Sequence, residues 1–272
     1  LATYFTNRLL SYLDSKGIQM AGWQEVAMLG VEDVNPRFGN SNVLAYCWNT
    51  PPETGNDIPY RIASEGYPIV MSNVTNLYFD LAYNNAFNEP GHNWSKSVDQ
   101  FTSFAMLPFT SDLDSYPSNT KKNIKGMQGQ LWAETIRGQN MLEYQLFPKM
   151  YGLVERAWNA SPKWKNQSDA AYISDVSKYN TVVNRKELPR LVDKNINFRI
   201  AQPGIMVEDG KLYLNSNIKD AEIRYTLDGS IPTVQSQLWV DPIVCNASMI
   251  VAKTFYLGKG SNISILSLFP QK

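Results

Sequence analysis

The chain has 272 residues, of which 43% are hydrophobic and 18% are charged, so it has an ordinary soluble composition and ample length for one or two cores. Its 25 basic and 25 acidic residues cancel, and no long run of Lys or Arg occurs, which argues against nucleic acid and anionic membranes as partners. No apolar run approaches the roughly 20 residues of a membrane span.

Residues for metal or redox chemistry are scarce. Cys47 and Cys245 are far apart in the sequence, and His92 is the single histidine. They suggest neither a disulfide framework nor a metal site, and we expect no cofactor. Seven Trp and fifteen Tyr favour carbohydrate as a ligand, because indole faces bind sugar rings, although core packing explains most Trp in any protein.

The start of the chain, Leu1-Ala2-Thr3, has neither an initiating Met nor a signal peptide, so we expect the interior of a longer protein. Six Asn-X-Ser/Thr triplets occur, which we interpret as chance matches because Asn73 lies in an apolar stretch. These triplets begin at Asn73, Asn93, Asn159, Asn166, Asn246 and Asn262.

The first half of the chain alternates helical and strand patterns. Residues 2–16 have apolar side chains at helical spacing, and Gly17 is a natural helix end. Short apolar runs predict strands at 18–22, 42–47 and 68–72, with a short helix at 56–66. A long irregular region follows at about 85–122, and a loop of that length is usually functional.

A fourth strand is predicted from Ile124 to Glu134, where two glycines suit a close-packed strand or a strand near a ligand. Alternate residues of a strand point to the same side, so Trp132 and Glu134 should face one volume. Leu142 to Trp158 then predicts one amphipathic helix, in which Pro148 is tolerated only near the start.

All four strands are uniformly apolar, which is typical of parallel strands buried on both faces, and ligands bind at the carboxyl ends of such strands. An aromatic ring beside a carboxylate suits a sugar, whose C–H face stacks and whose hydroxyls donate. A buried ring and a solvated acid would explain any single pair, but an aromatic residue recurs at all four strand ends and an acid accompanies it at three of them. The aromatic residues are Trp23, Trp48, Tyr78 and Trp132, and the acids are Glu25, Asp80 and Glu134.

The sequence pattern changes in the C-terminal part of the chain. Residues 168–197 have a helical pattern, and from about Ile200 the pattern becomes β, with a hairpin signal at Asp209-Gly210. About 70 residues of short strands with turn residues between them predict a small antiparallel sandwich. We therefore expect two domains, residues 1–198 and residues 199–272.

The strand-end motifs resemble family 20 glycoside hydrolases, the β-N-acetylhexosaminidases, in the order of that family. They are Gly22-Trp23-Gln24-Glu25, Trp48, Tyr78-Phe79-Asp80 and Trp132-Ala133-Glu134. The tail resembles the chitobiase-type C-terminal module of the family through Tyr225-Thr226-Leu227-Asp228-Gly229-Ser230 and Pro232-Thr233. Together the resemblance spans nearly the whole chain.

The resemblance implies an α/β fold with a (β/α)8 TIM barrel and an exported enzyme, periplasmic, cell-surface or extracellular. Its activity would be the removal of terminal GlcNAc or GalNAc from glycans with retention of configuration. In that mechanism the substrate acetamide attacks the anomeric carbon and forms an oxazolinium, so that no enzyme carboxylate is the nucleophile.

The resemblance also assigns roles. Trp23, Trp48 and Trp132 should enclose the acetamide methyl group, and Tyr78 should donate its hydroxyl to the acetamide oxygen. Asp80 and Glu134 should accept hydrogen bonds from the sugar hydroxyls at C4 and C6, and Trp94 should stack on the next sugar. Four further residues are interpreted as structural or rim residues, namely Glu25, Glu65, Glu89 and His92.

One departure from the family is serious. The general acid of the family is a Glu preceded by an Asp, on the strand before the one that ends at Trp23, and no Asp-Glu dipeptide occurs here. Because four strands cannot close an eight-stranded barrel, we expect the second half of the barrel plus the sandwich, with the N-terminal half supplied by the same protein or by another chain. Alone, the chain should be inactive.

Two alternatives stay open. The first is a non-catalytic carbohydrate-binding protein on a half-barrel scaffold. The second is a different barrel glycosidase whose acid lies within this chain, at Glu25 or Glu134.

Overall fold

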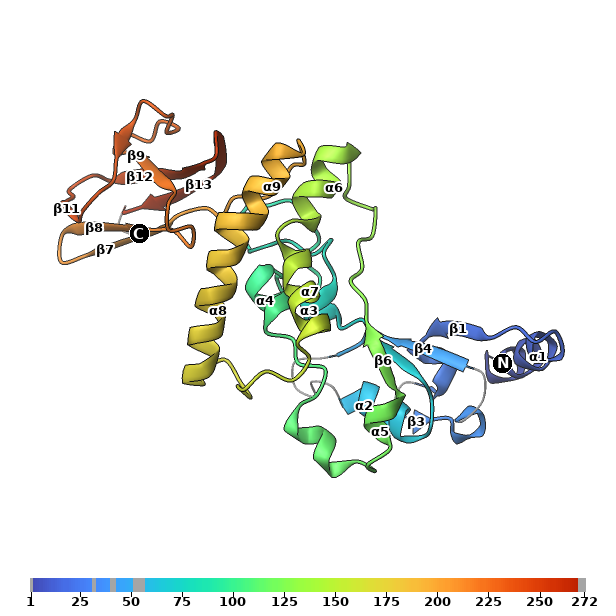
Figure 1. Cartoon of the computed structure of the whole chain (residues 1–272). Coiled ribbons are helices and arrows are strands. Elements are labelled where there is room, and N and C mark those ends of the chain that lie inside the picture. Colours follow the sequence, from blue (N-terminus) through green and yellow to red (C-terminus); the bar gives the residue numbers. More distant parts are fainter. Residues whose placement is uncertain (1, 31–32, 40–42, 51–56, 269–272) are drawn as a thin grey trace. The chain divides into compact units, whose positions relative to one another are not determined.

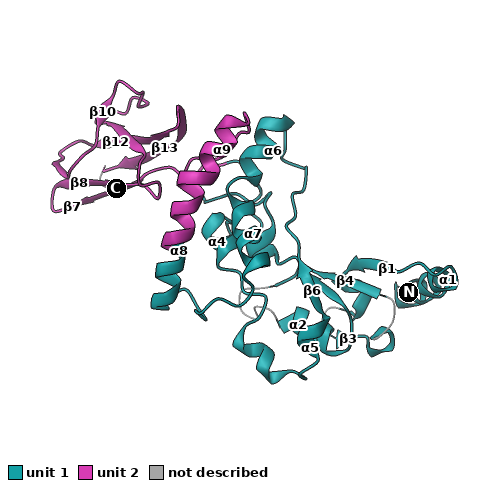
Figure 2. Ribbon diagram, in the orientation of Figure 1, with its two compact units in different colours: residues 1–85, 90–176 teal, residues 86–89, 177–272 magenta. Residues whose placement is uncertain are grey.

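The computed structural model describes residues 2–30, 33–39, 43–50 and 57–268, and Figure 1 shows the chain from end to end. Contacts divide it into two compact units, which Figure 2 colours separately. The first unit comprises residues 1–85 and 90–176, and the second comprises residues 86–89 and 177–272. None of the helices described is both long enough and apolar enough to cross a bilayer.

A four-stranded parallel sheet organises the first unit. Its strands are β1 (Met20–Trp23), β4 (Val43–Cys47), β5 (Ile69–Met71) and β6 (Ile124–Met127). They lie side by side in chain order, β1-β4-β5-β6, and each neighbouring pair is parallel. Their carboxyl ends therefore share one edge of the sheet, where ligands bind in folds of this kind.

Helices and short turns precede, connect and follow these strands. The helices are α1 (Ala2–Ser15), α2 (Asp57–Ser64), α3 (Val74–Leu77), α4 (Gln100–Phe104), α5 (Thr120–Asn123), α6 (Gly138–Leu146) and α7 (Lys149–Trp158). Three short 3₁₀ turns span Gln24–Ala27, Pro36–Phe38 and Ser111–Ser115, and a small antiparallel pair joins β2 (Met28–Leu29) to β3 (Asp33–Val34). The helix predicted at 2–16 is confirmed as α1, and Gly17 ends it at φ +68°.

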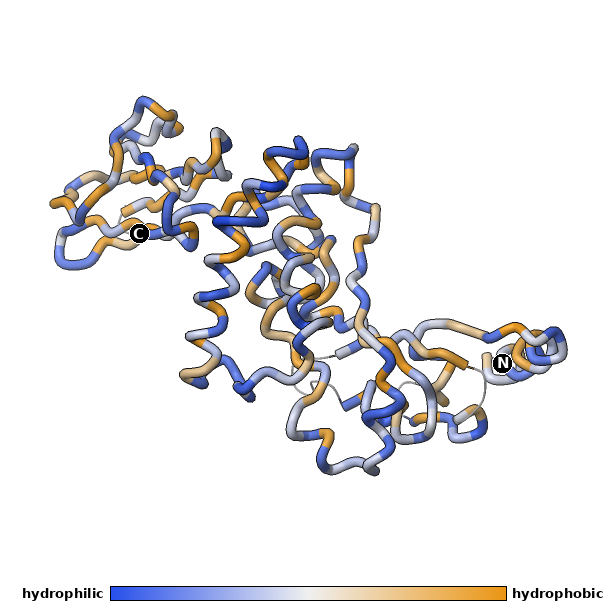
Figure 3. Tube along the Cα trace, in the orientation of Figure 1, coloured by the Kyte–Doolittle hydropathy of each residue, from blue (hydrophilic) through white to orange (hydrophobic). Residues whose placement is uncertain are grey.

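The core of the sheet is built by alternating side chains of β4 and β5. Ala45, Cys47, Ile69 and Met71 are fully buried and pack in one cluster with apolar residues of α2. The tube in Figure 3 is accordingly hydrophobic (orange) along β4. Burial raises the pKa of the Cys47 thiol, so it remains a protonated core residue rather than a nucleophile.

The prediction of one strand from Ile124 to Glu134 is wrong, because β6 ends at Met127. After it, Gln130 alone pairs with Tyr78 across an isolated parallel bridge. Gly129 explains the close approach, since an added Cβ there would lie 2.7 Å from the Phe79 ring. Residues 131–134 have no strand partner, so the alternation argument for Trp132 and Glu134 does not apply.

The single helix predicted from Leu142 to Trp158 is also wrong. The segment forms two helices, with α6 ending at Leu146 and α7 beginning at Lys149. Pro148 lies at the junction, where its missing N–H and its ring end the first helix. The region at 85–122, predicted to be irregular, holds two short helices and a 3₁₀ turn between long loops.

The second unit contains two antiparallel sheets that share one apolar core, as a sandwich requires. One sheet has the order β11-β8-β7, with β11 (Ile243–Val244), β8 (Lys211–Asn215) and β7 (Gly204–Glu208). The other has the order β10-β9-β12-β13, with β10 (Gln237–Leu238), β9 (Glu222–Thr226), β12 (Met249–Tyr256) and β13 (Lys259–Ser267). The hairpin predicted at Asp209-Gly210 is confirmed, with φ +48° and +69°.

The helical pattern at 168–197 corresponds to α8 (Ala170–Val182), a π turn (Val183–Glu187) and α9 (Leu188–Asp193). The division between the units falls within α8.

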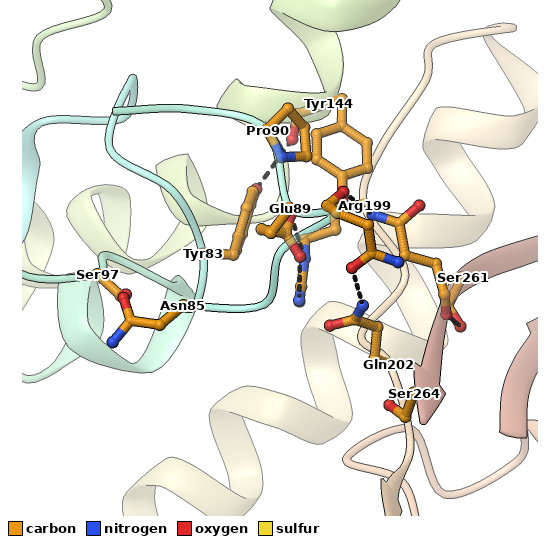
Figure 4. A network of polar contacts seen from close by, with 12 residues as sticks. Tyr83, Asn85, Glu89, Pro90, Ser97, Tyr144, Arg199, Gln202, Ser261 and Ser264 are labelled. Atoms are coloured by element: carbon orange, nitrogen blue, oxygen red, sulfur yellow. Dashed lines mark hydrogen bonds and ion pairs between the residues drawn. The ribbon is translucent and has the colours of Figure 1, made fainter. Parts of the chain in front are cut away.

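Residues 86–89 belong to the second unit through a buried ion pair. The Arg199 guanidinium donates to both carboxylate oxygens of Glu89 at 2.9–3.1 Å, and both side chains are almost completely buried (Figure 4). Beside it, Gln202 Nε2 donates to Asn88 Oδ1 at 3.0 Å, and Asn262 Nδ2 donates to the Asn88 carbonyl at 3.1 Å. This network gives Glu89 a structural role.

Candidate active site

Five aromatic side chains form one group at the carboxyl edge of the parallel sheet. Tyr78 is at its centre. Its ring stacks on Trp48 with centroids 6.5 Å apart and meets Trp94 and Trp132 edge-on, each at 6.3 Å. Trp132 in turn lies 5.7 Å from Trp23. The structure thus brings together all five aromatic residues that the sequence singled out.

Local structure explains how these rings meet. Trp23 is the last residue of β1, and Trp48 directly follows β4. The sequence predicts Tyr78 at the end of β5, but in the structure Tyr78 follows the single helical turn α3. The residues on either side of Tyr78 hydrogen-bond to Gln130: the Phe79 N–H donates to the Gln130 carbonyl at 2.7 Å, and the Gln130 N–H donates to the Leu77 carbonyl at 2.8 Å. That bridge brings Tyr78 beside the segment that carries Trp132.

The group has a buried floor and an open rim. Tyr78 is 5% exposed, whereas Trp132 and Trp94 are 38% and 57% exposed. Large aromatic surface left in water is available for stacking on a ligand. Burial raises the pKa of Tyr78 to about 12, the charges of Asp80 and Glu25 add to the rise, and a hydrogen bond with the Trp132 side chain opposes it. The phenol therefore stays protonated and able to donate at neutral pH.

Asp80 is an almost fully buried carboxylate, 1% exposed. Its Oδ1 has no hydrogen-bond donor among the described residues. Burial raises the pKa of Asp80, and backbone hydrogen bonding by Asp80 and Trp132, together with His92 and Lys149, acts against the rise. A buried acceptor without a donor is costly, so this oxygen is suited to a ligand hydroxyl.

Glu134 joins the group through His92. The Glu134 carboxylate lies 3.9 Å from His92 Nε2, and it is well exposed to solvent. The backbone N–H of His92 donates to the carbonyl of Asp80 at 2.8 Å, and Leu81 pairs with His92 in a parallel bridge. The second predicted acid therefore lies on the open side of the same group as Asp80.

Gln24 and Glu25 hold the end of β4 in place. The Gln24 carboxamide oxygen accepts the backbone N–H groups of Trp48 and Asn49, each at 3.0 Å. Glu25 Oε1 accepts the indole N–H of Trp48 at 3.0 Å. This contact orients the Trp48 ring and engages the Glu25 carboxylate, which favours the structural interpretation of Glu25 over a general acid.

Sequence reasoning assigned no role to three residues of this region. In the sequence, Gln24 is only part of a motif, and Gln130 only part of a predicted strand. Lys149 is one residue of a predicted helix, yet in the structure it is fully buried against the backbone beside Asp80. A charged residue within an apolar helical pattern was the one available signal, because such a residue is rarely buried without a partner.

Gly91 allows the close backbone pairing of His92 with Asp80 and Ala82. Its φ is +125°, and an added Cβ would lie 2.7 Å from the Ala82 nitrogen and 2.9 Å from the Asp80 carbonyl oxygen. We expect Gly91→Ala to break this pairing and to lower the free energy of unfolding by about 1–3 kcal/mol in urea titrations.

The matched control for this change is Gly126→Ala. An added Cβ at Gly126 meets no atom within 4 Å, so this variant should unfold close to the parent midpoint. Equal unfolding curves for the two variants would contradict the role given to Gly91.

The group offers apolar ring faces, one protonated hydroxyl donor and two carboxylate acceptors. This combination binds polyhydroxylated rings, whose C–H faces stack while their hydroxyls donate. Within the described part of the chain, no cluster of three or more His, Cys, Asp or Glu is arranged to hold a metal ion.

Comparison with known proteins gives two family matches. Residues 1–161 match the glycosyl hydrolase family 20 catalytic domain, and residues 187–262 match the chitobiase/beta-hexosaminidase C-terminal domain. The first match covers more than half of the chain and contains every candidate site residue.

Curated relatives are longer than this chain. N,N'-diacetylchitobiase of Vibrio harveyi is 25% identical over 263 residues, which cover 84% of this chain and 29% of that protein. Beta-hexosaminidase B of Pseudoalteromonas piscicida is 29% identical over 198 residues, covering 65% of this chain and 25% of that protein. The chain thus spans less than a third of the length of the relatives it matches.

Solved structures support the fold. A family 20 exo-β-N-acetylglucosaminidase of Vibrio harveyi, in complex with N-acetylglucosamine, superposes with a TM-score of 0.52 at 22% identity, covering 72% of this chain and 27% of that one. A mutant beta-hexosaminidase of Streptomyces plicatus gives 0.53 at 21% identity, covering 73% and 36%. These similarities indicate an α/β fold derived from the TIM barrel, with a C-terminal domain.

Proposed function

The chain belongs to glycosyl hydrolase family 20, and we propose that it forms the sugar-binding part of a retaining exo-β-N-acetylhexosaminidase. One observation carries the proposal. Five aromatic side chains, one of them the protonated phenol of Tyr78, lie together with two carboxylates at the carboxyl edge of a parallel sheet. The substrate would be a glycan that ends in GlcNAc or GalNAc.

We propose that residues 1–198 are the second half of a (β/α)8 barrel with its outer helices, and that residues 199–272 are a separate sandwich module. The four parallel strands in chain order support this arrangement. The first half-barrel would come from the same protein or from another chain, and it would carry the general acid, because no Asp-Glu pair occurs here. The assembled enzyme would act after export, in the periplasm, at the cell surface or outside the cell.

In the proposed mechanism, the acetamide group of the substrate is the nucleophile. Trp23, Trp48 and Trp132 enclose its methyl group, exclude water and hold it under the sugar ring. The Tyr78 hydroxyl donates to the acetamide oxygen, which fixes it for attack on the anomeric carbon and stabilises the charge of the oxazolinium as it develops. The pKa of about 12 keeps Tyr78 a donor throughout the neutral range.

The two acids bind rather than cleave. The free Oδ1 of Asp80 accepts from the hydroxyl at C4, and the exposed carboxylate of Glu134 accepts from the hydroxyl at C6. Trp94, which is more than half exposed, stacks on the following sugar. Each contact is made to the terminal sugar or its neighbour, which is what exo-action on a chain end requires.

A turnover assay tests the proposal. The protein made from its complete reading frame should release the aryl group from an aryl N-acetyl-β-glucosaminide and should leave the matching aryl β-glucoside, which lacks the acetamide, almost untouched. Residues 1–272 alone should give no turnover of either substrate. Equal rates on the two substrates would contradict acetamide participation, and robust cleavage by residues 1–272 would contradict the missing acid.

A second candidate is a carbohydrate-binding protein without activity, favoured only by the absence of an Asp-Glu pair. In that case the complete protein would bind N-acetylglucosamine in calorimetry and show no turnover. A barrel glycosidase with its acid at Glu134 is separated by Glu134→Gln. A joint loss of affinity and rate fits a contact to a sugar hydroxyl, whereas selective loss of one limb of the pH profile fits a general acid.

A further inference from the structure

Lys149 is a fully buried cation beside the proposed sugar-binding carboxylate. Its ammonium group donates to the carbonyl of Phe79 at 2.8 Å and to that of Leu81 at 2.6 Å. These two carbonyls flank Asp80 in the chain. Their common donor therefore fixes the backbone on both sides of Asp80, whose buried Oδ1 has no hydrogen-bond donor among the described residues.

The same helix junction holds the other end of the loop. Lys149 also donates to Gln145 Oε1 at 3.1 Å, and the Gln145 amide donates to the Pro90 carbonyl at 2.8 Å. Pro90 lies two residues before His92, whose backbone pairs with residues 80–82. The Lys149 ammonium thus ties residues 79–82 to the α6–α7 junction. It also holds Gln145, whose amide ties residues 90–92 to the same junction.

An aromatic ring closes the site around this cation. The Lys149 ammonium lies 3.8 Å from the centroid of the Tyr83 ring, and the Tyr83 hydroxyl donates to the Tyr144 carbonyl at 3.0 Å. A buried ammonium with three hydrogen-bond acceptors and a ring face is fully coordinated. It has little freedom to move, so it serves as a rigid support.

We propose that Lys149 is a positioning residue for Asp80. It sets the position and the ionisation of the Asp80 carboxylate, which binds the terminal sugar. This inference rests on the proposed function, because it takes Asp80 as an acceptor for a sugar hydroxyl. It goes beyond that function by assigning a role to a residue on α7 that is not a member of the aromatic group.

Charge adds to geometry. Burial raises the pKa of Asp80, and the groups that face it are Lys149, His92 and the uncharged Tyr78, with Glu25 farther away beside Tyr78. Lys149 holds the pKa of Asp80 lower than burial alone would set it. Because only the ionised carboxylate is a pure acceptor, loss of this charge should confine binding to higher pH.

The test compares Lys149→Met with Lys149→Arg in the protein made from its complete reading frame. The Met variant removes the donor and the charge at similar length, and we expect kcat/KM on the aryl N-acetyl-β-glucosaminide to fall about 10- to 100-fold. The acidic limb of its pH profile should move to higher pH. The Arg variant keeps a cation and several donors, so it should recover much of the rate and keep the limb near its original place.

Two further variants separate positioning from folding. Arg156→Met removes another buried cation of α7, one that lies over the Phe104 and Trp164 rings, and it should lower stability but leave the pH profile of the folded enzyme unchanged. Asp80→Asn should remove most of the effect of Lys149→Met in the double variant, because the two act through one contact. If Lys149→Met does not fold, Lys149→Gln is the neutral variant and is judged in the same way.

The outcomes are distinct. Absence of turnover in the parent protein would overturn the proposed function itself. With an active parent, an unchanged kcat/KM and pH profile in the neutral Lys149 variant, or additive losses with Asp80→Asn, would overturn the role given to Lys149.

Discussion

Tyr78→Phe should lower kcat of the complete enzyme about 10²- to 10³-fold, which is the cost of one donor that stabilises a developing charge. KM should change far less, since the ring remains. The Tyr78 ring is 5% exposed and held by Trp48, Trp94 and Trp132, so removal of the hydroxyl leaves the packing of the aromatic group intact.

The reason for a selective effect on kcat lies in when the hydrogen bond is strongest. In the free substrate the acetamide oxygen is a neutral acceptor, and it becomes part of a charged ring only as it attacks the anomeric carbon. A donor held in a dry site gains most at that moment. The burial that raises the pKa of Tyr78 to about 12 also guarantees that the donor is present.

Steady-state kinetics of Tyr78→Phe and Tyr46→Phe provide the measurement. Tyr46 meets Trp23 edge-on at 6.0 Å, so it belongs to the same neighbourhood without touching Tyr78 or Asp80 in any described contact. Its hydroxyl should be dispensable. A fall in kcat of equal size in both variants, or a Tyr78→Phe effect confined to KM, would contradict the assigned role of the Tyr78 hydroxyl.

The parallel sheet could be predicted because its signal is local. The short apolar runs predicted as strands at 42–47 and 68–72 correspond to β4 and β5, in which alternate residues are fully buried and those between them partly buried. Because the carboxyl ends of parallel strands lie on one edge of the sheet, the aromatic residues at these ends could be predicted to lie close together. Trp23 and Trp48 follow that rule directly.

Elements that depend on tertiary contacts were misplaced. Residues Ile124–Glu134 have the composition of a strand, but β6 ends at Met127. Beyond it, Gln130 pairs with Tyr78 in an isolated bridge. The apolar spacing around Pro148 fits one helix, and only the packing of α6 and α7 decides where it breaks. Periodicity describes which face is buried, but not where a hydrogen-bond ladder ends.

Supporting residues were beyond sequence reasoning for a different reason. Gln24, Gln130 and Lys149 act by contacts to the backbone of residues distant in the chain, such as Lys149 to Phe79. No spacing rule connects them with the residues they hold. The candidate site residues follow a family pattern, whereas the residues that hold them in place can be identified only from the three-dimensional structure.

Glu89→Gln should lower the free energy of unfolding by about 3–5 kcal/mol, since it leaves the Arg199 guanidinium buried without its counter-charge. Both side chains of the pair are almost inaccessible to water, and three hydrogen bonds join them. Urea unfolding followed by far-UV circular dichroism measures the change. Because the chain has two units, the loss should be sought in the transition of the second unit if two transitions are resolved.

The second unit also contains the matched control. Arg185 and Asp220 form an equally bidentate pair at 2.9 and 3.1 Å, but about half of each side chain is exposed. Water and salt screen such a pair, so Arg185→Met should leave the urea midpoint nearly unchanged. Equal shifts for Glu89→Gln and Arg185→Met would mean that burial does not determine the strength of the effect.

A double variant distinguishes an attractive pair from an unpaired charge. In Glu89→Leu with Arg199→Met, neither charge remains, and the apolar side chains are similar in size to the groups they replace. Much of the stability lost in Glu89→Gln should return, because the large cost belongs to a single buried charge and not to the absence of the pair. If the double variant is as unstable as Glu89→Gln, the ion pair itself contributes the stability, and Glu89 holds residues 86–89 by attraction to Arg199.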